Sequence, residues 1–94
     1  MATTETETVC EVLKSIEDRV RSTTPGGLSR RAYLERIAEA LDWGPWAVRY
    51  QTETPGARPP RPRALRAWMD AAGATLDEER RLRRALLPPR GRGA

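Results

Sequence analysis

Apolar side chains recur at three- and four-residue spacing in several stretches of this chain, and short runs of glycine and proline separate these stretches. Such spacing places the apolar side chains on one face of an α-helix. The first stretch predicts a helix over residues 8–23, with Thr8 and Glu11 in the pattern of a capping box. Residues 25–27, Pro-Gly-Gly, break this helix. Its apolar face consists of Val9, Val12, Leu13, Ile16 and Val20.

Two further helices are predicted on either side of a very short turn. The first covers residues 29–42, with Ser29 as its N-cap, and the second covers residues 45–52. Pro45 suits the first position of a helix, because the N–H that proline lacks would have no partner there. The buried stripe of the first of these helices consists of Leu34, Ile37, Ala38 and Leu41, with Leu28 packing back on Tyr33.

The segment after the short turn, residues 45–52, also fits a strand. Val48, Tyr50, Thr52 and Thr54 alternate with polar residues, which is the pattern of a half-buried strand. The helix is the preferred interpretation. A strand over residues 49–54 would instead favour a winged arrangement.

Residues 54–62 are rich in proline and arginine. They are expected to form an extended, polyproline-like loop, because proline offers no N–H to a helix or a central strand. A fourth helix is predicted over residues 63–72, ending at Gly73, and a fifth over residues 75–87, with Thr75 and Glu78 as a second capping box. Their inward-facing residues are Leu65, Trp68, Met69 and Ala72 in the fourth, and Leu82, Ala85 and Leu86 in the fifth.

These elements predict one compact all-α domain of five helices over residues 8–88. A chain of 94 residues supports a single core, because so short a chain buries only about 60% of the surface it exposes when unfolded. Residues 1–7 are polar and residues 89–94 are basic. Both segments are expected to be disordered tails.

The residue types present argue against most catalytic chemistry. The chain has one cysteine, Cys10, and no histidine. It therefore lacks the residues for an internal disulfide, a cysteine-histidine metal site or a nucleophile-histidine pair. Cys10 is expected to be a buried or half-buried thiol. We expect no enzyme activity, no cofactor and no metal.

The N-terminus and the lengths of the apolar runs bear on location. No apolar run approaches the roughly 20 residues that span a bilayer. The first residues are acidic and hydroxylated, whereas a secretory signal is basic and then apolar. These features predict a cytoplasmic protein with no membrane partner.

Positive charge is concentrated in the second half of the chain. Residues 1–24 hold three basic and five acidic side chains, residues 25–56 hold four of each, and residues 57–94 hold ten arginines and four acids. All 17 basic residues except Lys14 are arginine, which binds phosphates and guanine edges in a bidentate manner. A GC-rich genome would produce the same preference for arginine without any ligand.

Residues 34–52 carry the feature that points to a function. Ala38 lies in the middle of one predicted helix, Trp43 and Gly44 occupy the tight turn, and Val48 lies midway along the next helix. This stretch resembles the helix-turn-helix of lambda-repressor-like and excisionase-like regulators, in which a small residue allows the two helices to touch and an apolar residue anchors the second helix.

Two positions depart from the pattern of these regulators. Asp42 occupies the turn position usually held by glycine in a left-handed conformation, which aspartate tolerates better than most residues. Gln51 lies where a second apolar anchor is usual, and Tyr50 is one position early.

The resemblance implies a sequence-specific regulator of transcription, of phage or mobile-element type, that binds duplex DNA and is nucleoid-associated. A homodimer is expected, because one short recognition helix contacts too few base pairs for useful specificity. Arg49 would read a guanine edge. The outward-facing residues of the recognition helix would be Trp46, Ala47, Arg49, Tyr50 and Glu53.

A packing role competes with this interpretation for the two aromatic residues. In a small domain without phenylalanine, Trp46 and Tyr50 could be core residues, and for Trp46 the core is the preferred placement.

Other arginines form candidate phosphate contacts. Arg30 and Arg31 lie in the first turn of a predicted helix, where a phosphate would relieve their repulsion by the helix dipole. Arg58, Arg61 and Arg63 are spaced by prolines and resemble a basic arm that follows a phosphate backbone or enters a minor groove. Solvated charges and a plain surface loop are the alternatives. The arginines at positions 80, 81, 83 and 84 could instead pair with the acids at positions 77–79 of their own helix.

Two other functions remain open. A small interaction or inhibitor protein would present the same arginine- and tryptophan-rich surface to an acidic protein or to a nucleic-acid enzyme. A nonspecific nucleic-acid binder would depend on the proline-arginine arm alone.

Overall fold

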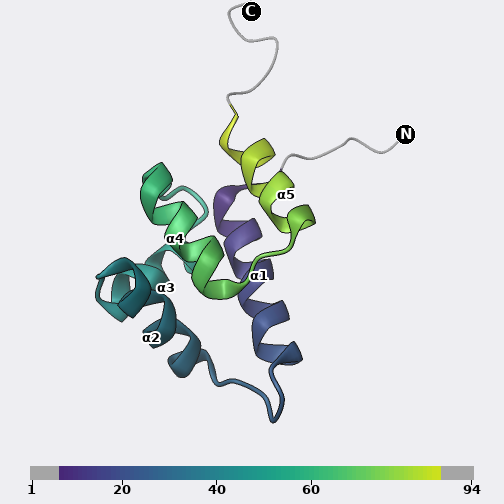
Figure 1. Ribbon diagram of the computed structural model, residues 1–94. Coiled ribbons are helices and arrows are strands. Elements are labelled where there is room, and N and C mark those ends of the chain that lie inside the picture. Colours follow the sequence, from purple (N-terminus) through teal and green to yellow (C-terminus); the bar gives the residue numbers. More distant parts are fainter. Residues whose placement is uncertain (1–6, 88–94) are drawn as a thin grey trace, which may run out of the picture.

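The computed structural model describes residues 7–87, which form five α-helices and no strand (Figure 1). The all-α prediction is confirmed, and each helix begins and ends within one residue of its predicted bounds. Because the third helix extends through Glu53, the alternative of a strand over residues 49–54 is wrong. The two predicted tails lie outside the described residues, apart from Glu7. The helices are α1 (Val9–Thr23), α2 (Arg30–Leu41), α3 (Pro45–Glu53), α4 (Pro62–Ala72) and α5 (Leu76–Leu86).

The predicted caps define the helix ends. Thr8 and Thr75 form reciprocal capping boxes at the starts of α1 and α5, and the Ser29 side chain accepts a hydrogen bond from the Ala32 N–H at 3.1 Å. Asp42 ends α2 with φ 60° and ψ 42°. This left-handed conformation lets the Trp43 N–H reach the Ala38 carbonyl at 2.9 Å. The chain therefore reverses sharply between α2 and α3, with aspartate in place of the expected glycine.

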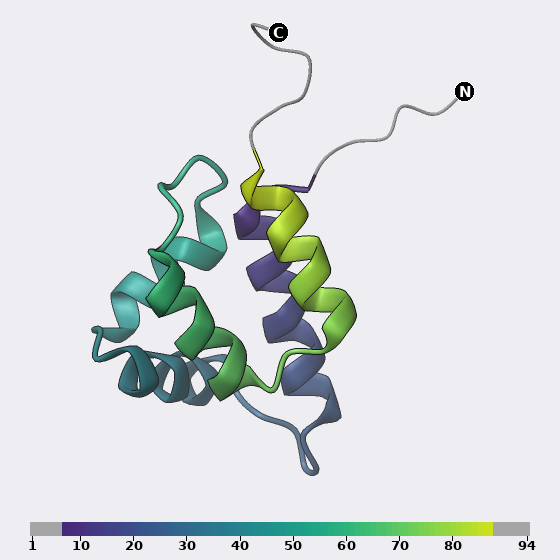
Figure 2. The same cartoon turned by 45° about the horizontal axis from the view of Figure 1, so that its top comes forward.

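Helix α1 lies at the centre of the molecule and packs against the other four helices (Figure 2). On one side it contacts α2, α3 and α4, and α2 in turn packs against both α3 and α4. On the other side it contacts α5. The side chains that are completely buried come mainly from α1 and α2, with one each from α3 and α4. These side chains are Val12, Leu13, Ile16, Glu17, Tyr33, Ile37, Val48 and Trp68.

A group of aromatic rings joins α2, the turn and α4. The Trp68 indole N–H donates a hydrogen bond to the Tyr33 hydroxyl at 3.1 Å, and both side chains are completely buried. Trp43 packs edge-on against Trp68, with ring centroids 6.3 Å apart and planes at 86°. Since a buried indole N–H without a partner would be costly, this hydrogen bond is what allows tryptophan into the core.

One aromatic residue and one leucine lie elsewhere than preferred from the sequence. Trp46 is 76% exposed, so its preferred placement in the core is wrong. Tyr50 is 50% exposed, as the helix-turn-helix interpretation expects, and the alternative that it is a core residue is wrong. Leu86 is 43% exposed rather than inward-facing, because α5 packs mainly on α1 and this side of α5 faces a groove.

The proline-rich connection between α3 and α4 is only partly extended. The Ala57 N–H donates to the Thr54 carbonyl at 3.0 Å, which closes a turn. Pro60 is buried. Pro62 belongs to α4 as its first residue, a position that favours proline. The loop is therefore shorter and more tightly packed than a free polyproline arm.

Ala38 tests the packing of α2. Its side chain is 3% exposed within the core, whereas Ala40, two residues further along α2, is exposed. Ala38→Leu should overpack the core and lower the free energy of unfolding by about 1–3 kcal/mol. Ala40→Leu is the matched control and should leave it nearly unchanged. Urea denaturation measures both, and equal stability of the two variants would contradict this account of the packing.

Tyr33 predicts loss of stability at alkaline pH. Burial raises the pKa of Tyr33 to about 12 despite the hydrogen bond from Trp68, because an ionised phenolate would be desolvated. The folded state therefore holds its proton more tightly than the unfolded state, whose pKa is about 10. The contribution of Tyr33 to the free energy of unfolding is therefore complete below a pH of about 10. It should fall by as much as about 3 kcal/mol as the pH rises to about 12.

Urea denaturation across this pH range measures the effect. Burial also raises the pKa of the Cys10 thiol, so the comparison is made in a Cys10→Ala background. Adding Tyr33→Phe should flatten the fall in stability with pH, whatever it does to stability at neutral pH. An unchanged slope would show that Tyr33 is not the responsible group.

Candidate nucleic-acid interface

One face of α3 is buried and the opposite face is open to solvent. Val48 and Thr52, four residues apart, are 0% and 3% exposed and anchor the helix on the core. Trp46 and Tyr50 project outward, and the side chain of Arg49 between them is 63% exposed. The helix therefore presents two aromatic rings and a guanidinium on a short, firmly anchored support.

The second anchor of α3 is polar. In the helix-turn-helix pattern that this stretch resembles, a second apolar anchor is usual at the position of Gln51, but here the buried residue is Thr52. Its hydroxyl donates to the Arg49 carbonyl at 3.0 Å and accepts from Arg30 at 3.1 Å. Gln51 lies partly exposed and donates from its side chain to the Arg58 carbonyl at 3.0 Å, which ties the loop to α3.

Arg30 joins three helices through carboxylates. Its guanidinium lies 2.5 Å from the Glu53 carboxylate of α3 and 3.2 Å from the completely buried Glu17 of α1. Glu17 also pairs with Arg21 at 3.2 Å. The hydrogen bond with Glu53 raises the pKa of Arg30 and lowers the pKa of Glu53. Arg30 thus fixes the end of α3 against α1 and α2, and its charge is already balanced.

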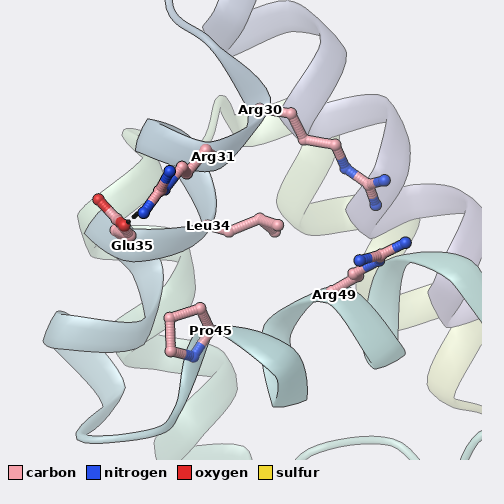
Figure 3. A pocket seen from close by; sticks show the side chains of 6 residues that line it. All are labelled: Arg30, Arg31, Leu34, Glu35, Pro45 and Arg49. Carbon is pink, nitrogen blue, oxygen red and sulfur yellow. Dashed lines mark hydrogen bonds and ion pairs between the residues drawn. The ribbon is translucent and has the colours of Figure 1, made fainter.

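A groove of about 570 Å³ lies between the first turns of α2 and the start of α3 (Figure 3). In this view Arg30 and Arg49 extend toward each other on one side, while Arg31 turns toward Glu35 on the other. Leu34 and Pro45 form its apolar part. The groove therefore brings together three of the predicted phosphate- or base-binding arginines.

Two of these arginines have only weak internal partners. The side chain of Arg31 is 89% exposed and lies 3.3 Å from Glu35, and Arg49 lies 3.2 Å from Glu53. Both are exposed pairs four residues apart on one helix, which contribute at most about 0.5 kcal/mol. A phosphate or a base edge can therefore displace the carboxylate at little cost. The first turn of α2 holds no acidic residue, so its dipole adds to the positive potential.

The remaining predicted arginines lie outside the groove. Arg58 is exposed in the loop that Gln51 fastens to α3, Arg61 is the N-cap of α4, and Arg63 lies in its first turn. Within residues 7–87, none of the three forms an ion pair. The structure brings Arg58 close to the end of α3, while Arg61 and Arg63 belong to a neighbouring surface.

Two ion pairs of α5, one with α1 and one with Glu7 just before α1, were missed by the sequence analysis. Arg19 donates to both carboxylate oxygens of Glu78, at 2.6 and 2.9 Å, and Arg81 binds Glu7. Burial would raise the pKa of Glu78, but Arg19 and Thr75 outweigh it and the pKa is lowered. The predicted pairing within α5 is therefore wrong for Glu78 and Arg81, because their partners lie across the helix interface. The sequence pattern around Glu78 and Arg81 predicts only a capping box and pairs within the helix, so it does not indicate these distant partners.

Within the described part of the chain, no group of three or more histidine, cysteine or acidic side chains is placed to hold a metal ion. No helix there has the length and apolar character that crossing a membrane requires.

The comparisons with known proteins give no relative: no protein-family model, curated protein or solved structure matches this chain.

Two adjacent arginines test which side chains are structural. Arg30→Ala leaves the buried Glu17 with one cation fewer and should lower the free energy of unfolding by about 3 kcal/mol. Arg31→Ala removes an exposed side chain and should change it by less than about 0.5 kcal/mol. Urea denaturation at neutral pH compares the two variants. Equal losses would mean that the network around Glu17 contributes nothing specific.

Proposed function

We propose that α2, the turn at Asp42 and α3 act as a helix-turn-helix that binds duplex DNA, with α3 as the recognition helix. The observation that carries this proposal is the open face of α3, anchored behind by Val48 and bordered by the arginine-lined groove. The major groove of B-DNA is about 12 Å wide and admits one α-helix. A helix held by one face only is free to enter it.

The outward side chains of α3 supply contacts of the kind that read bases. Arg49 reaches into solvent and offers the bidentate donors that match the O6 and N7 atoms of guanine. Trp46 and Tyr50 flank it and offer apolar surface for thymine methyl groups, with the tyrosine hydroxyl as a further hydrogen-bonding group. Glu53 balances Arg30 and Arg49, so releasing Arg49 to DNA leaves this carboxylate paired.

Phosphate contacts would come from the surfaces beside α3. Arg31 at the start of α2 is almost fully exposed, and the helix N-terminus favours an anion there. Arg58, Arg61 and Arg63 would extend the contact along the backbone. In this arrangement Arg30 acts through its support of α3 and not through DNA.

We further propose a regulator of transcription that acts as a homodimer, of the type found in phages and mobile elements. A nine-residue recognition helix contacts only a few base pairs, and a second copy would double the length of the site.

A second candidate function uses the same face of α3. Trp46 is 76% exposed, and exposed tryptophan beside arginine is typical of the residues that dominate protein interfaces. In that case the ligand is an acidic protein surface, and no nucleic acid binds.

Two arginines separate base reading from phosphate binding. Duplexes are first enriched from a random library, and fluorescence anisotropy then measures affinity over a range of salt concentrations. Arg49→Ala should cost about 1–3 kcal/mol on the preferred duplex and reduce discrimination between duplexes. Arg58→Ala should weaken all duplexes alike and reduce the slope of log affinity against log salt by about 0.9.

Arg80→Ala is the matched control, since Arg80 is equally exposed but lies on α5. It should leave both affinity and salt slope unchanged. Equal effects of all three variants would mean that binding depends on overall positive charge and not on a specific interface around α3. If wild-type protein binds no duplex, single strand or RNA at low salt, the DNA proposal is refuted and the protein-binding candidate stands.

A further inference from the structure

A second concave surface lies between α4 and α5, on the other side of α4 from the α2–α3 groove. It has a volume of about 460 Å³. Both helices pack on α1, and the short connection at Gly73 brings α5 back beside α4, so that the start of α4 and the end of α5 lie at the same end of the molecule (Figure 2). The groove is lined by side chains of α4 and α5 and by the prolines at the start of α4.

The floor of this groove is apolar and its open end is not covered. Leu65, Met69 and Leu82 are 5–6% exposed and close the bottom. Leu86 is 43% exposed, and the adjacent Leu87 is 61% exposed. Two exposed leucines next to an apolar floor form the kind of surface that marks a binding groove.

The walls of the groove carry more positive than negative charge. Arg66 on α4 and Arg83 on α5 both line the groove and are exposed, and neither forms an ion pair within residues 7–87. Glu79, one turn before Arg83 on α5, is the acidic residue of the lining. Two arginines and one glutamate therefore leave net positive charge around an apolar floor.

We propose that this groove binds an acidic amphipathic helix of another protein. Its apolar residues, at i, i+3 or i+4 and i+7, would contact the floor, and its carboxylates would pair with Arg66 and Arg83. An 11-residue wall such as α4 or α5 is about 16 Å long, which matches an occupant of three turns.

The test uses the full chain and a labelled synthetic peptide of about four turns. The peptide has leucine at i, i+3 and i+7, glutamate on both flanks and alanine elsewhere. One control peptide has the same composition in scrambled order, and another has lysine in place of glutamate. Fluorescence anisotropy should show saturable binding of the acidic peptide only, at least about tenfold tighter than either control.

Matched variants locate the binding. Leu86→Asp should weaken the acidic peptide at least about tenfold, whereas Leu76→Asp, which alters a 63% exposed leucine of α5 outside the groove, should not. Arg83→Glu should weaken binding of the acidic peptide and strengthen binding of the lysine peptide. Arg80→Glu should change both affinities less. Circular dichroism confirms that each variant is folded.

Three results would overturn the proposal. The first is no saturable binding of the acidic peptide by the wild-type chain. The second is equal effects of the groove variants and their controls. The third is a dimer in sedimentation equilibrium that Leu86→Asp dissociates, which would show that a second copy of this chain occupies the groove. The duplex-binding assay on Leu86→Asp separates this surface from α3, because DNA affinity should be retained when peptide affinity is lost.

Discussion

Burial of the apolar face of α1 is the constraint on which the other elements depend. This helix contributes three completely buried apolar residues, Val12, Leu13 and Ile16, and contacts all four other helices. With so few apolar side chains available, the chain buries them by surrounding one helix, since no pair of helices could form a sufficient core. The α2–α3–α4 group and α5 therefore lie on different sides of α1, and each keeps one face that no other helix covers.

Ion pairs then determine which charges remain available. Glu17 holds Arg21 and Arg30, and Glu78 holds Arg19, so these carboxylates neutralise cations at the helix interfaces. The cost of removing charges from water makes such pairs a doubtful source of net stability, but losing one partner would leave a buried charge uncompensated. The exposed arginines of α2, α3, the loop and the α4–α5 groove are left without strong partners and are the ones available for ligands.

The two surfaces that we propose for recognition follow from this division, and they differ in chemistry. The α3 surface combines exposed aromatic rings with arginines, which suits the edges of bases and phosphates. The α4–α5 groove has an apolar floor below arginines, which suits a helix that has one apolar face and one acidic face. Because α1 and α4 separate the surfaces, one chain could hold DNA with the first and a protein with the second.

Local sequence determined the five helices, their caps and their apolar faces, because spacing, capping residues, glycine and proline act within a few residues. It also placed Arg49 and Arg31 on exposed positions of α3 and α2. The apolar spacing of the fourth helix also placed Trp68 in the core. Only the tertiary structure decided that Trp43 packs against Trp68 while Trp46 stays outside, since local spacing does not say which further aromatic ring a small interior will hold. Likewise, the pairing of Arg30 with Glu17 and Glu53 and the opening beside Leu86 depend on how distant helices meet, and residue spacing along the chain carries no information about that.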